Sequence, residues 1–116
     1  MTITRFHAGR RMSQAVVCSG MVFLSGQVAE DHSQDVTGQT RQVLGAIDKL
    51  LAEAGSDKSR LLSANIFLAD MADFSAMNAV WDGWVSPGNT PARATVQAQL
   101  ARPHWRVEIV VTAAVS

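Results

Sequence analysis

Two stretches near the C-terminal end of this chain alternate between apolar and polar residues, and they restrict the fold more than any other feature. In residues 90–100 the apolar positions are Ala92, Ala94, Val96, Ala98 and Leu100, and the polar positions are Arg93, Thr95, Gln97 and Gln99. Residues 107–111 repeat the pattern, with Glu108 between two apolar positions. A period of two is that of a half-buried β-strand, so the sequence predicts two strands here.

Arg93 and Glu108 are the charged residues near the beginnings of these two strands. The arginine side chain presents a planar set of donors that suits a carboxylate or a phosphate. The pattern leaves two interpretations open. The two residues form a ligand site on rigid strands, or they form an ordinary cross-strand ion pair.

The N-terminal part predicts a strand at residues 3–7 and a hairpin made of residues 13–18 and 21–27. Ser19-Gly20 is a two-residue connection of the kind that joins hairpin strands, and it places Ser25 opposite Gln14. A small residue and a glycine at Ser25-Gly26 allow a ligand or another backbone to come close. A simple strand end explains the same residues.

Two helices are predicted, with a strand at residues 61–69 between them. The first, at residues 37–54, has its apolar stripe at Val43, Leu44, Ile47, Leu50, Leu51 and Ala54. Asp35 or Thr37 caps its start, and Gly55 suits its C-terminal end. Asp73 caps the second, which runs from Phe74 to about Val85, with Phe74, Met77, Trp81 and Trp84 in its buried stripe. Asn78 lies at the edge of that stripe, where it ties the helix to a loop or lines a pocket.

The 116 residues therefore predict one domain, residues 1–116, of the α+β class: a sheet of about six strands with both helices on one face. We expect the other face to carry Arg93, Thr95, Gln97 and Glu108 among apolar residues. Charged residues are only 17% of the chain, against about 25% in typical domains. Contact with other subunits would cover such a face.

Composition excludes several classes of function. The formal net charge is zero, which does not fit a nucleic-acid binder. No apolar run reaches the roughly 18 to 20 residues of a membrane helix, and the single cysteine, Cys18, fits a cytoplasmic protein. His7, His32 and His104 are scattered, so we expect no metal site.

Several segments, in order and with compatible spacing, resemble the RidA/YjgF family, and the short chain resembles its YoaB-like bacterial branch. They are residues 12–16 (MSQAV), 22–27 (VFLSGQ), 39–44 (QTRQVL), 54–56 (AGS), 66–74 (IFLADMADF), 91–96 (PARATV) and 107–109 (VEI), with Asn78. The resemblance implies a chorismate-mutase-like fold, with a mainly antiparallel sheet, and a homotrimer with pockets between subunits. It also implies cofactor-free hydrolysis of 2-imino or enamine acids to 2-oxo acids and ammonia.

The resemblance also implies roles for individual residues. Arg93 corresponds to the carboxylate-binding arginine and Glu108 to the water-positioning glutamate. Ser25, Gly26, whose carbonyl faces the site, and Asn78 correspond to further pocket residues. Two positions depart from the family pattern: Met12 stands in place of a common tyrosine and cannot form a strong hydrogen bond. Thr95 replaces a frequent cysteine, and its backbone N–H can still serve the substrate carboxylate.

Two other functions are alternatives to hydrolysis: ligand binding without catalysis, and RNA cleavage. A non-catalytic trimer that binds small 2-oxo acids would need Arg93 but not Glu108 or Gly26. The endoribonuclease description that some relatives carry fits poorly with zero net charge and the absence of a basic stripe.

Overall fold

The computed structural model describes residues 1–115, which form six strands and two α-helices. The strands are β1 (Ile3–Phe6), β2 (Ala15–Cys18), β3 (Met21–Leu24), β4 (Leu61–Leu68), β5 (Ala92–Gln97) and β6 (Val107–Ala114). The helices are α1 (Val36–Glu53) and α2 (Phe74–Trp84), and short 3-10 turns, η1 (Lys58–Arg60) and η2 (Met71–Asp73), precede β4 and α2. This is the predicted element order.

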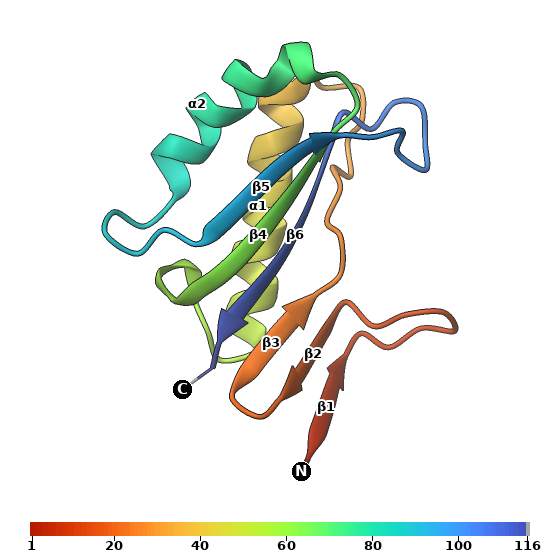
Figure 1. Cartoon of the computed structure of the whole chain (residues 1–116). Coiled ribbons are helices and arrows are strands. Elements are labelled where there is room, and N and C mark those ends of the chain that lie inside the picture. The colour runs from red at the N-terminus through yellow and green to blue at the C-terminus, as the bar shows by residue number, and fades with distance from the viewer. Residues whose placement is uncertain (116) are drawn as a thin grey trace.

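The strands form one sheet in the order β1-β2-β3-β6-β4-β5, with both helices on one face of it (Figure 1). Only β4 and β5 are parallel neighbours, and the other pairs are antiparallel. The predicted α+β class and the mainly antiparallel sheet are therefore confirmed.

Local sequence signals explain the hairpin and the first helix. Val17 pairs with Val22 across the Ser19-Gly20 turn, which is the register of the predicted hairpin. The Asp35 carboxylate accepts a hydrogen bond of 2.9 Å from the Gly38 N–H and so caps α1. Gly55 has φ +82, the left-handed conformation that ends many helices.

The core lies between the helices and the sheet. Its fully buried members come from α1, α2 and the strands β3, β4 and β6, and they include Val22, Leu44, Ile47, Leu51, Ile66, Met77 and Ile109. Phe74, predicted to be in the buried stripe of α2, is 38% exposed. It is the first residue of the helix. Asp73 precedes α2 as predicted, but its side chain makes no capping hydrogen bond.

One prediction about the sheet is wrong: Arg93 and Glu108 do not share a face. Arg93 pairs with Ala64 and Thr95 with Ile66, so both lie on the face that the helices cover. Glu108 pairs with Phe67, on the opposite face. The predicted alternation of apolar and polar residues is present in β5. The apolar residues of this strand face away from the helices, and its polar residues face α2.

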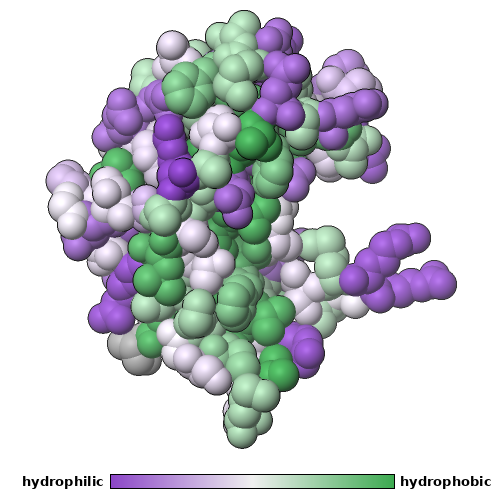
Figure 2. Space-filling model, viewed as in Figure 1, coloured by the Kyte–Doolittle hydropathy of each residue, from purple (hydrophilic) through white to green (hydrophobic). Residues whose placement is uncertain are grey.

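The uncovered face is consequently more apolar than predicted. The strand registers place on it Phe23, Asn65, Phe67, Ala94, Val96, Glu108, Val110 and Thr112. Phe23 is 45% exposed and Val96 is 47% exposed. Figure 2 shows this side of the molecule, with hydrophobic and weakly polar side chains over the strands and most of the strongly hydrophilic ones around them.

Candidate functional site

The predicted site residues fall into two groups on the single chain. The first, which we call the Glu108 group, consists of Ser25, Gly26 and Glu108. Phe23 pairs with Thr112 and Gln27 pairs with Ile109, so the segment after β3 carries one residue more than β6 between these two pairs. Such a β-bulge redirects side chains, and here it brings the Gly26 backbone against the Glu108 side chain.

Gly26 leaves no room for a larger residue while Glu108 keeps its conformation. A Cβ at position 26 would lie 2.9 Å from Glu108 Cδ and closer still to Glu108 Oε2. Real Cβ atoms essentially never approach other atoms that closely, so a substitution would displace the glutamate. The absence of a side chain at Gly26 therefore leaves the space that this carboxylate occupies.

Two glutamines, Gln14 and Gln27, form hydrogen bonds with Ser25. Neither was among the predicted site residues. Ser25 Oγ donates to Gln14 Oε1 at 3.0 Å. Gln27 Nε2 lies 3.1 Å from Gln14 Oε1 and 3.1 Å from the Ser25 carbonyl oxygen, and it donates to both. The predicted Ser25–Gln14 pairing, supported also by a 2.9 Å backbone hydrogen bond, was the available signal for Gln14.

The second group, which we call the Arg93 group, consists of Arg93, Thr95 and Asn78, at the contact of β5 with α2. Arg93 Cζ lies 5.3 Å from the centre of the Trp81 ring, within range of a cation–π interaction. Thr95 Oγ1 and Asn78 Oδ1 are buried, and neither has a hydrogen-bond partner among residues 1–115. Buried polar atoms without partners are costly, and because solvent does not reach these two atoms in the single chain, the side chains around them would have to move before a ligand could bond to them.

The two groups are separated within the chain. β4 lies between β5 and β6, and the side chains of Arg93 and Glu108 leave opposite faces of the sheet. The described residues contain no Arg93–Glu108 ion pair, so the cross-strand pair considered above does not form. Met12 is 50% exposed in the loop before β2, two residues from Gln14.

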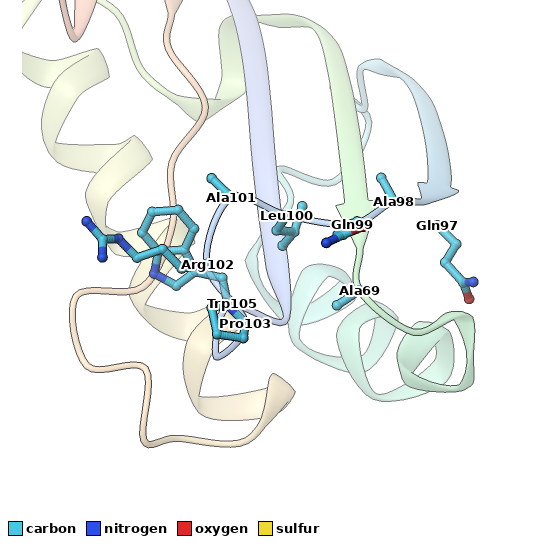
Figure 3. Close-up of a pocket in the computed structure, with 9 residues that line it drawn as sticks. All are labelled: Ala69, Gln97, Ala98, Gln99, Leu100, Ala101, Arg102, Pro103 and Trp105. Atoms are coloured by element: carbon cyan, nitrogen blue, oxygen red, sulfur yellow. The ribbon is translucent and has the colours of Figure 1, made fainter.

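A cavity of about 460 Å³ lies at the end of the sheet where β4 and β5 finish (Figure 3). It is lined by Ala69, Gln97, Ala98, Gln99, Leu100, Ala101, Arg102, Pro103 and Trp105. Arg102 Cζ lies 5.7 Å from the Trp105 ring centre. None of the predicted site residues lines this cavity, so the described chain alone does not enclose a pocket around Arg93 and Glu108 there.

The structure offers no obvious alternative chemistry based on a metal. Among residues 1–115, His, Cys, Asp and Glu side chains nowhere gather in a group of three or more that could hold an ion. Neither described helix is long and apolar enough to cross a membrane.

Comparisons with known proteins agree on the family. Residues 2–115 match the family described as endoribonuclease L-PSP. The chain is 46% identical over 115 residues to the RutC family protein YoaB of Escherichia coli, covering 99% of this chain and 100% of that protein. It superimposes with a TM-score of 0.98 on a YjgF family member from Neisseria meningitidis, at 52% identity, covering 100% and 97% of the two chains. A chloroplastic protein of Arabidopsis thaliana named Reactive Intermediate Deaminase A is 34% identical over 103 residues, which is 84% of this chain and 54% of that protein.

Proposed function

Because this chain belongs to the endoribonuclease L-PSP family, also called RidA/YjgF, we propose that it hydrolyses reactive 2-imino and enamine acids to 2-oxo acids and ammonia. The relative named a reactive intermediate deaminase supports the reaction class. The observation that carries the proposal is the pair of groups on one chain: a cation beside unpartnered polar atoms, and a carboxylate fixed against a glycine.

The site is completed between subunits. Since the Arg93 group and the Glu108 group lie on opposite faces of the sheet, one copy's Arg93 meets the Glu108 of the next copy. Contacts between two different patches generate a ring when they close, and the homotrimer of the predicted assembly is such a ring. The exposed apolar face with Phe23 and Val96 supplies surface for that contact.

The reaction needs few groups. An imine carbon next to a carboxylate is already electrophilic, and a water molecule adds to it. Arg93 binds the substrate carboxylate through its planar donors. Glu108 and the Gly26 carbonyl orient the water, and Glu108 takes one of its protons as general base. Glu108 returns that proton to the imine nitrogen, which gives a carbinolamine. Transfer of the carbinolamine hydroxyl proton to its amino group, again through Glu108, expels ammonia and leaves the 2-oxo acid.

The remaining residues position the substrate. Thr95 offers a backbone N–H to the carboxylate, and Ser25 and Asn78 contribute hydrogen bonds around it. Met12 can offer only apolar contact. It therefore contacts the side chain of the imino acid. We further propose that no cofactor is required and that the protein acts in the cytoplasm.

A coupled assay tests this function. An amino-acid oxidase or dehydratase generates the imine, semicarbazide traps what remains, and purified wild type is compared with Arg93→Ala. Wild type should divert imine to 2-oxo acid, and the variant should not. If wild type has no effect with any imine but still binds 2-oxo acids, the non-catalytic binding function replaces this proposal.

A further inference from the structure

Two glycines inside helices border one groove on the helical side of the molecule. Gly45 lies within α1 and Gly83 within α2, and neither has a positive φ. A Cβ built at either position would meet nothing within 4 Å. Glycine in a helix interior costs about 0.5–1 kcal/mol relative to alanine. Neither the backbone conformation nor close packing requires glycine at these two positions. What the two glycines provide is open space beside the helices.

That space is a groove of about 420 Å³ between α1 and α2. Its volume falls within the range of about 300–1,000 Å³ that is typical of small-molecule sites. Leu44 and Val80 contribute apolar surface, and the Trp84 ring forms part of one wall. Trp84 Nε1 donates to Asp48 Oδ2 at 2.9 Å, which fixes the orientation of the ring.

The groove also carries excess positive charge. Arg41 and Lys58 both line it, and Lys58 Nζ lies 5.5 Å from the Trp84 ring centre. Neither cation has a carboxylate partner within 4.0 Å in the part of the chain that the structure describes. The one carboxylate of the groove, that of Asp48, accepts the Trp84 N–H and offsets one of the two cations, so one positive charge remains in excess. An anionic ligand would therefore be favoured over a neutral one.

We propose that this groove binds a small aromatic carboxylate. Its ring packs against Trp84 and the Leu44 and Val80 side chains, and its carboxylate lies between Arg41 and Lys58. The groove shares no residue with the Arg93 or Glu108 groups, but Trp84 packs against Trp81, with 5.3 Å between the ring centres, and Arg93 lies over Trp81. The apolar contacts and the charge contacts can be removed separately, which makes the proposal testable.

The test is a titration with benzoate, followed by NMR at the Trp84 indole N–H, whose signal is assigned by its loss in Trp84→Phe. Benzamide keeps the ring without the charge, and acetate keeps the charge without the ring. Benzoate should shift the signal saturably, and both controls should bind at least tenfold more weakly. The double variant Arg41→Ala/Lys58→Ala should lose at least tenfold in affinity, whereas Lys49→Ala on the same helix should not.

The glycine variants separate binding from folding. Gly45→Ala should raise the melting temperature because it removes the cost of a helical glycine. Gly45→Leu should fill the groove and abolish the benzoate shift without lowering the melting temperature. Absence of a saturable benzoate shift, equal binding of benzamide, or full binding by a folded Gly45→Leu protein would overturn the proposal, whatever the result of the imine assay.

Discussion

Arg93 and Glu108 extend from opposite faces of the same sheet, with β4 between their strands. Within a single chain the two side chains therefore do not face one common site. Arg93 lies over Trp81 beside the unpartnered atoms of Thr95 and Asn78, and Glu108 lies against Gly26. We propose that each is half of a site whose complement is on another copy.

Loss of the Arg93 guanidinium should remove most of the substrate binding. A hydrogen bond to a charged group contributes about 1.5–3 kcal/mol, so Arg93→Ala should lower kcat/KM for imine hydrolysis by about 10- to 150-fold. Arg93→Lys should restore little, because an ammonium group lacks the planar donors. Arg102→Ala removes another exposed arginine and should keep full activity. Wild-type rates in Arg93→Ala would remove this residue from the mechanism.

A methyl group at position 26 should disturb catalysis through Glu108. In Gly26→Ala the new Cβ displaces the glutamate, and we expect at least a tenfold loss of kcat with a small change in stability. The control is Gly9→Ala, whose Cβ would lie 3.4 Å from the Met12 carbonyl oxygen. If displacement of Glu108 is the cause, Gly26→Ala should cost little more in a Glu108→Gln background. Additive losses would contradict it.

The sequence predicted the parts of the fold that depend on local chemistry. Ser19-Gly20 set the hairpin register that pairs Val17 with Val22, and Asp35 and Gly55 marked the ends of α1. The sequence did not predict that β4 lies between β5 and β6 in the sheet. The order of the strands depends on contacts between segments that are distant in the sequence, and local residue patterns do not reveal those contacts.

The sequence also could not predict which face of the sheet carries Arg93. Alternation shows that β5 has two different faces, but not which of them a helix covers. Here the polar face with Arg93 and Thr95 is turned to α2, and the apolar face with Val96 is left open. The usual expectation, apolar toward the helices, holds for β4 and β6 and is reversed on this edge strand.

Gln39 should be among the most sensitive polar positions for stability. It is fully buried, its Nε2 donates to the Gln34 carbonyl at 2.9 Å and the His104 carbonyl at 3.0 Å, and its Oε1 accepts from the Arg106 N–H at 2.9 Å. Gln39→Leu leaves these backbone groups without partners, and we expect a loss of about 2–4 kcal/mol in the free energy of unfolding. Urea denaturation measures this loss, with exposed Gln99→Leu as the control. A change below about 1 kcal/mol would contradict the assignment.

Asp57 should titrate below its ordinary range. Hydrogen bonds from the Ser59 hydroxyl and the Ser59 N–H, at 2.8 Å for the latter, lower the pKa of its carboxyl from 3.8. Because the folded pKa is depressed, the stabilisation is present above pH 3.8 and is lost as the pH falls through the folded value. Carbon-detected NMR titration should show the lowered pKa in wild type and a rise toward 3.8 in Ser59→Ala. An unchanged pKa in that variant would show that the hydroxyl is not the cause.

Mixing of subunits tests the central claim most directly. Arg93→Ala and Glu108→Gln proteins, each inactive alone, are unfolded together in equal amounts, reassembled and assayed for imine hydrolysis. If the site joins Arg93 of one copy to Glu108 of another, random mixing leaves both residues intact in about a quarter of the sites, and about a quarter of wild-type activity should return. Recovery of no activity from mixed assemblies that form normally would contradict a site shared between subunits.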